Sequence, residues 1–140
     1  MKESVKTAFT DWFFNKSRML NLGIGLFAVL LYEVMRAYYR PYIYAQGIND
    51  FHIADTLGNS LGTVATVFVF TSMFGLDHAR EIFLIRTVTI SVFLYELAHP
   101  LLGKSIDPWD MVATIFAGIF CESIHKLMHK PSISTISTPT

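Results

Sequence analysis

Four apolar stretches run through the chain, at residues 19–38, 53–74, 82–101 and 110–127. A bilayer core is about 30 Å thick, so a helix of roughly 20 apolar residues can cross it. Segments within these stretches, such as 27–31 and 64–70, are apolar almost all round. A helix of a water-soluble bundle would instead keep a charged outer face. The pattern therefore predicts an all-α, integral membrane four-helix bundle.

The chain contains two similar halves. Residues 27–36 (FAVLLYEVMR) and 90–99 (ISVFLYELAH) each place an acid and then a basic group inside an apolar run. Each is followed by a second apolar run that opens with closely spaced polar groups. We interpret the segments at about 19–74 and 82–127 as two helical-hairpin repeats that run parallel to one another.

The repeats align four acids in pairs, with Glu33 matching Glu96 on the first arms and Asp55 matching Asp110 on the second. Carboxylates inside membrane-length segments are costly, so they are usually functional or paired with other groups. Helical spacing places further polar side chains on the same faces as these acids. The candidate ligand-binding residues are Glu33, Arg36, His52, Asp55, Asn59, Glu96, His99, Asp107 and Asp110.

Small residues four positions apart let membrane helices approach closely. Gly58 and Gly62 have this spacing in the second stretch, and Ala113 and Ala117 have it in the fourth. We expect close helix contacts at these positions.

Composition agrees with a membrane protein. Hydrophobic residues make up 52% of the chain, charged residues make up 16%, and the net charge is zero. Nucleic-acid binding is therefore not expected. The single cysteine, Cys121, excludes an internal disulfide, and no sequence motif indicates a cofactor.

Basic residues predict the orientation. Eight of them fall before the first stretch, near the second loop or around the end of the fourth stretch, and three fall on the other side: Arg36, Arg40 and Lys104. The positive-inside bias then places both termini in the cytoplasm. The expected organisation is a cytoplasmic or interfacial segment at 1–18, a transmembrane domain at 19–130 and a flexible tail at 131–140. A bacterial inner (cytoplasmic) membrane is the expected location.

Residues 96–118 (ELAHPLLGKSIDPWDMVATIFAG) resemble the closing signature of VanZ-like membrane proteins. The matching positions are Glu96, His99, Asp107, Asp110, Thr114 and Gly118. Two positions depart from that signature: Lys104 only loosely represents the usual basic residue, and Thr114 stands where the family has Asn. The resemblance implies a small multi-spanning protein with a role in the cell envelope.

The acids have three explanations. They can hold the hairpins together as buried pairs, they can line a cavity that binds a polar headgroup, or they can bind a metal through His52, Asp55, His99 and Asp107. The spacing His-x-x-Asp is common, so we predict no metal. A second cluster, Glu122, His125 and His129, also shares a helix face, and an ordinary interfacial helix end explains it more simply.

Three functions therefore stay open. The chain can be an envelope protein that binds a lipid-linked or glycopeptide-like ligand at the outer leaflet, with membrane lipids as its other partners. It can be an interaction protein, such as a toxin-immunity factor, a phage-defence protein or the subunit of a homo-oligomeric channel. It can also be a membrane-embedded enzyme in which one buried acid donates a proton and its partner accepts one.

Overall fold

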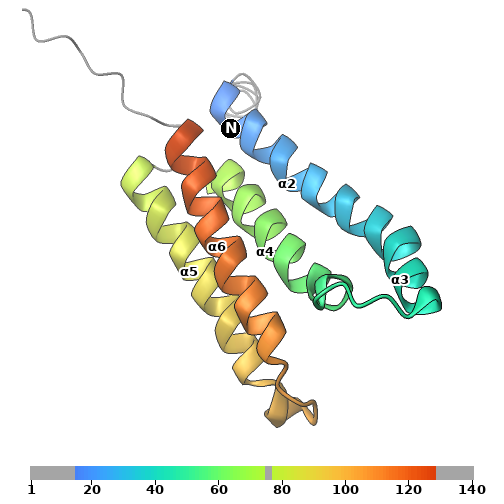
Figure 1. Cartoon of the computed structure of the whole chain (residues 1–140). Coiled ribbons are helices and arrows are strands. Elements are labelled where there is room, and N and C mark those ends of the chain that lie inside the picture. The colour runs from blue at the N-terminus through green and yellow to red at the C-terminus, as the bar shows by residue number, and fades with distance from the viewer. Residues whose placement is uncertain (1–14, 75–76, 129–140) are drawn as a thin grey trace, which may run out of the picture.

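The computed structural model describes residues 15–74 and 77–128, and its regular elements in these ranges are helical (Figure 1). The long helices are α2 (Lys16–Val34), α4 (Ile53–Phe74), α5 (His78–Leu97) and α6 (Pro108–Met128). The short helix α3 (Arg40–Gln46) continues α2 through a π-helical segment, Met35–Tyr39, and a 3-10 turn, His99–Leu102, follows α5. The all-α prediction is confirmed. The interfacial segment and the tail predicted at the two ends of the chain fall mainly outside the described residues.

Local sequence explains where the helices begin and end. Pro41 has no N–H to donate to a carbonyl of the preceding turn, and the π-helical segment lies just before it. Gly47 ends α3 with a left-handed backbone conformation, φ 63°. The side chain of Asp77 accepts a hydrogen bond from the Arg80 backbone N–H at 3.0 Å, and this cap starts α5 four residues before the predicted position.

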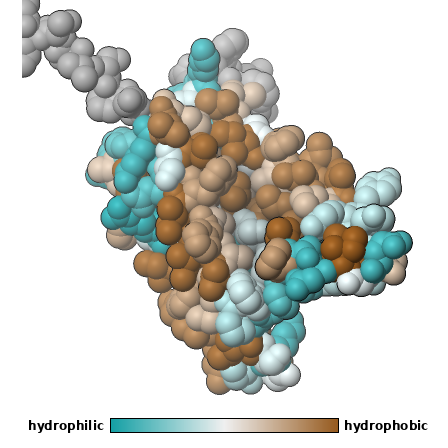
Figure 2. Space-filling view, viewed as in Figure 1, coloured by the Kyte–Doolittle hydropathy of each residue, from teal (hydrophilic) through white to brown (hydrophobic). Residues whose placement is uncertain are grey.

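Three of the described helices are long and apolar enough to cross a membrane: Lys16–Gln46, Ile53–Phe74 and Pro108–Met128. Figure 2 shows apolar side chains over most of the visible face, with hydrophilic residues gathered along the edge on the side of α5 and around α3. Large side chains such as Phe27, Leu30 and Phe116 are more than 60% exposed. An apolar surface of this extent requires an apolar environment or a partner.

The helices are arranged around α4 rather than in a ring of four. Helices α4, α5 and α6 pack against one another, whereas α2 packs against α4 alone among them. The core lies where these helices meet and includes the fully buried side chains of Val67, Phe68, Ile85 and Cys121. No other described helix consequently covers the outer face of α2.

Glycines permit two of these helix contacts. An added Cβ atom on Gly25 of α2 would lie 2.8 Å from a methyl group of Val69 and 3.2 Å from the backbone oxygen of Ala65, both on α4. An added Cβ on Gly118 of α6 would overlap the side chain of Thr89 on α5. Gly62, where we expected a close contact, has open space beside it.

The chain runs up and down, so its loops gather at two ends (Figure 1). We call the end that carries residues 47–52 and 98–107 the distal end. At the other end, which we call the proximal end, α2 and α5 begin and α4 and α6 finish.

We predict that Gly25→Ala destabilises the protein by about 1–3 kcal/mol, because the new methyl group overpacks the contact between α2 and α4. Gly23→Ala is the matched control on the same helix, since nothing lies within 4 Å of its added Cβ. It should leave stability unchanged or raise it by up to about 1 kcal/mol through higher helix propensity. Thermal unfolding of the purified protein in detergent measures both effects, and equal melting temperatures for the two variants would contradict the packing described above.

Candidate functional site

Polar side chains from three helices meet at the distal end. The side-chain amide of Asn59 on α4 lies near the carboxylate of Asp110 on α6. The charges of Asp107, Glu96 and His99 also act on this carboxylate. We call these five residues the inner cluster. Four of them come from the stretch of 15 residues between the end of α5 and the start of α6, and α4 supplies the fifth.

Glu96 is the most buried member of the inner cluster. Its side chain is only 1% exposed, and its Oε2 atom lies 3.1 Å from Nδ1 of His99, which is 13% exposed. The ring of Tyr95 covers His99 edge-on, with the ring centroids 5.0 Å apart. The Glu96–His99 pair spans the end of α5, so the Glu96 carboxylate is held inside the protein near the end of this helix.

A second polar group, the outer cluster, surrounds Asp55 at the start of α4. The hydroxyl of Tyr44 donates a hydrogen bond to Asp55 Oδ1, and Nδ1 of His52 lies 3.3 Å from Oδ2. The guanidinium of Arg40 donates to the Tyr44 hydroxyl at 3.0 Å and approaches Asp55 to 3.9 Å. Asp55 is partly exposed, so this cluster is accessible from the surface.

The turn before α4 brings the two clusters together. Phe51 and His52 both have left-handed backbones, with φ of 57° and 64°, a conformation that non-glycine residues adopt at a cost. Asp50 stabilises the turn by accepting hydrogen bonds from the Ala54 backbone N–H at 2.7 Å and the Tyr39 hydroxyl at 3.2 Å. The His52 ring stacks on Trp109 of α6 with centroids 5.1 Å apart. The strained turn thus places the outer cluster beside the start of α6.

Glu33 and Arg36 do not join these clusters. Glu33 accepts a 2.8 Å hydrogen bond from Arg36 on its own helix, and both side chains are more than half exposed. The duplication predicted that Glu33 would share the environment of Glu96, which is buried. The two environments differ, so seven of the nine predicted ligand-binding residues gather in the two clusters and these two do not.

Two other positions of the VanZ-like signature have structural roles. Thr114 is fully buried, and its hydroxyl donates to the backbone oxygen of Asp110 at 2.9 Å. Gly118 provides the tight contact with Thr89 on α5.

The proximal end holds a polar group that the sequence did not lead us to predict. His125 of α6 is fully buried, and its Nε2 atom lies 3.3 Å from Glu81 Oε2 and 3.1 Å from His78 Nδ1, both on α5. Glu122, which shares a helix face with His125 in the sequence, instead contacts Arg86 and Lys126. His129 lies outside the described residues. Glu81 lies four positions before the buried Ile85 and therefore shares its helix face. This spacing is the sequence signal that predicts a buried position for Glu81.

No group of three or more His, Cys, Asp or Glu side chains within 15–74 and 77–128 is arranged to hold a metal ion. The hypothetical ligands His52 and Asp55 belong to the outer cluster, whereas His99 and Asp107 belong to the inner cluster. The chain matches no family model, no curated protein and no solved structure with which it was compared. Its resemblance to VanZ-like proteins therefore rests on the signature of residues 96–118.

We predict that His99→Ala destabilises the protein by roughly 3–5 kcal/mol, because it leaves the Glu96 carboxylate buried without its partner. Arg36→Ala is the matched control, since it breaks an acid–base pair of the same i,i+3 spacing on an exposed surface and should cost less than about 1 kcal/mol. Denaturant or thermal unfolding in detergent separates the two variants. Similar losses would mean that the Glu96 pair is not buried in the folded protein.

Proposed function

We propose that this chain is a membrane protein with four spans whose distal end binds a polar headgroup. Three spans follow from length and composition. We infer that α5 is the fourth, because its 20 residues give a length of about 30 Å and both of its acids are buried. Glu81 and Glu96 are buried, and Arg86 is paired with Glu122.

The observation that carries the proposal is the inner cluster, where carboxylates outnumber cations, with Glu96 buried and Asp107 and Asp110 partly exposed beside it. Glu96, Asp107 and Asp110 provide three acids, and His99 is the single basic group that acts on Asp110. Acids of the same sign gathered in poorly solvated surroundings repel one another unless a cation or hydrogen-bond donors offset the charge. We therefore expect the inner cluster to bind a ligand that supplies a cation or hydrogen-bond donors.

The chemistry of the cluster favours a ligand with N–H or O–H donors. Ionised carboxylates only accept hydrogen bonds, and an ammonium group or sugar hydroxyls donate them. Trp109 and Tyr44 lie beside the acids and are exposed by about half, which suits contact with the apolar part of a headgroup. A lipid-linked or glycopeptide-like envelope component has this combination of groups.

The VanZ-like signature and the distribution of basic residues support a place in a bacterial inner membrane, with both termini in the cytoplasm and the distal end outside. Binding requires no chemical step. An enzyme that uses Glu96 and Asp110 as acid and base would need the same cluster, so the two hypotheses share their site.

One observation favours a second function, interaction through membrane helices. The outer face of α2 carries Leu26, Phe27 and Leu30, each more than half exposed, and α2 contacts only α4 among the long helices. A partner helix, or a second copy of the chain, would find an uncovered apolar surface there. This role would use α2 rather than the inner cluster.

We predict that the distal end faces outward. In a Cys121→Ser background, cysteine at the exposed position 104 should react with a membrane-impermeant maleimide on intact cells, and cysteine at position 80 should react only after the cells are opened. Both native side chains are exposed, so accessibility within the protein does not distinguish them. Labelling of position 80 on intact cells would reverse the orientation.

We predict that Asp110→Asn abolishes headgroup binding while leaving the melting temperature within a few degrees of the native protein, because the amide keeps the shape and loses the charge. A defined probe is phosphatidylethanolamine, whose primary ammonium donates hydrogen bonds, against phosphatidylcholine, whose methylated headgroup does not. Native mass spectrometry should show preferential retention of phosphatidylethanolamine by the native protein and by the Glu33→Gln control.

The same measurement tests the purely structural role. If Asp110→Asn retains phosphatidylethanolamine as well as the native protein does, the inner cluster does not bind an ammonium headgroup. If binding and melting temperature fall together, the cluster holds the helices in place and the loss of binding is a consequence of unfolding.

A further inference from the structure

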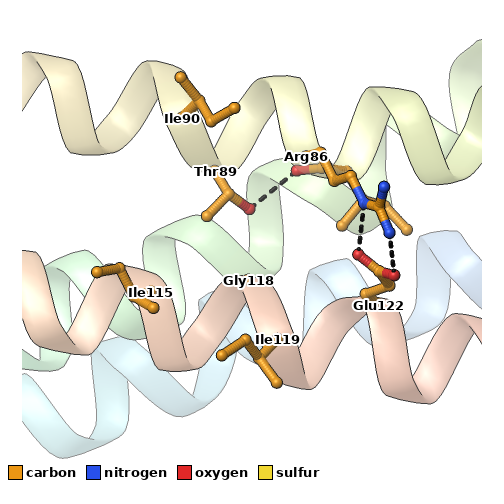
Figure 3. Close-up of a pocket in the computed structure, with 8 residues that line it drawn as sticks. Arg86, Thr89, Ile90, Ile115, Gly118, Ile119 and Glu122 are labelled. Atoms are coloured by element: carbon orange, nitrogen blue, oxygen red, sulfur yellow. Dashed lines mark hydrogen bonds and ion pairs between the residues drawn. The ribbon is translucent and has the colours of Figure 1, made fainter.

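A groove runs between α5 and α6 around the middle of both helices (Figure 3). Its volume is about 230 Å³. Its apolar walls come from both helices and consist of Ile85, Ile90, Ile115 and Ile119. Thr89 and Gly118 line it where the two helices are in tight contact.

The proximal end of this groove carries an ion pair. Nε and Nη2 of Arg86 donate to the two carboxylate oxygens of Glu122 at 2.8 and 2.7 Å, which joins α5 to α6. Lys126, one turn further along α6, donates to Glu122 Oε1 at 2.6 Å. Two cations thus share one acid, and this group of three has a net charge of +1.

Both cations keep hydrogen-bonding capacity toward the outside. The side chain of Arg86 is 60% exposed and that of Lys126 is 54% exposed, whereas Glu122 is only 19% exposed. A guanidinium group has five N–H donors, of which Glu122 takes two. A second anion can therefore bind on the outer side of the pair without displacing Glu122.

The depth and exposure of Arg86 favour such an anion. Arg86 lies eight residues into α5, about 12 Å along the helix from its start. If α5 spans the bilayer, as proposed above, an exposed charge at this depth is costly unless the side chain extends toward the headgroups and is neutralised there. Lys126 lies two residues from the end of α6, at the level where lipid phosphates would be found.

We propose that this groove is a binding site for an anionic phospholipid of the leaflet at the proximal end. The phosphate lies against Lys126 and the outer edge of Arg86, and one acyl chain lies along the isoleucine walls. The cations select a negatively charged headgroup, and the groove holds the chain that follows it. A second copy of the chain would bring another net positive charge to the same place, so charge favours a lipid as the occupant.

Competitive lipid binding tests the site. The full chain in detergent is mixed with equal amounts of palmitoyl-oleoyl phosphatidylglycerol and phosphatidylcholine, and native mass spectrometry counts the lipids that remain bound. The native protein should prefer phosphatidylglycerol. Each of Arg86→Gln and Lys126→Gln should reduce that preference about fivefold, the amount expected for one cation near a membrane surface.

Matched variants separate a built site from diffuse attraction. Arg80→Gln removes an exposed cation from the same end of α5, outside the groove, and should change the preference much less. Ile119→Trp fills the groove and should reduce retention of the lipid. Phe120→Trp, at the adjacent exposed position of α6, should not. Lys126→Gln leaves the Arg86–Glu122 pair intact, so it remains informative if Arg86→Gln fails to fold.

Three outcomes would overturn the proposal. The first is equal retention of the two lipids by the native protein. The second is an equal loss of the preference for phosphatidylglycerol in Arg80→Gln and Arg86→Gln. The third is a dimer in solution that Ile119→Trp dissociates, because a second copy of the chain would then be the occupant of the groove. Asp110 lies at the other end of α6, so the Asp110→Asn variant should keep the preference for phosphatidylglycerol. Failure here is thus distinguishable from failure of the headgroup site at the distal end.

Discussion

The cost of placing charge among apolar side chains is the constraint on which the arrangement of α5 depends. This helix carries Glu81, Arg86 and Glu96, and each has an oppositely charged or titratable partner within 3.3 Å. Two of these partners, Glu122 and His125, belong to α6. Two of the charges that make α5 the least apolar of the long helices therefore bind it to its neighbour. Removing one partner from such a pair costs far more than the pair contributes on an exposed surface.

Close backbone approach supplies the second set of contacts. Gly25 fits α2 onto α4, and Gly118 fits α6 onto α5, so each of the two hairpins has one glycine contact that a larger residue would disrupt. Apolar side chains alone give little specificity between helices in a lipid environment, because lipid tails are equally apolar. Tight glycine contacts and paired charges together determine which helix faces are buried and which, such as the outer face of α2, remain exposed.

The two ends of the molecule have different electrostatic character. At the distal end the inner cluster contains more acids than cations, and a strained turn holds the outer cluster beside it. At the proximal end the Arg86–Glu122–Lys126 group is positively charged and borders an apolar groove. The proposed ligands follow from this difference, since hydrogen-bond donors suit the first end and an anionic headgroup suits the second. Both proposals place the polar part of a lipid or lipid-linked molecule where the helices end.

The sequence by itself determined the helical class, the bounds of α4 and most of the inner cluster, because apolar length and local spacing are properties of one helix at a time. Glu96, His99, Asp107 and Asp110 are close in sequence, and a short connection between two helices keeps them close in space. Only the tertiary structure decided that Glu33 pairs on the surface, that α2 packs on one neighbour and that Arg86 meets Glu122. It also decided that His125 is buried beside Glu81. These outcomes depend on how far each helix is rotated about its axis, and contacts between residues 36 or more positions apart set that rotation.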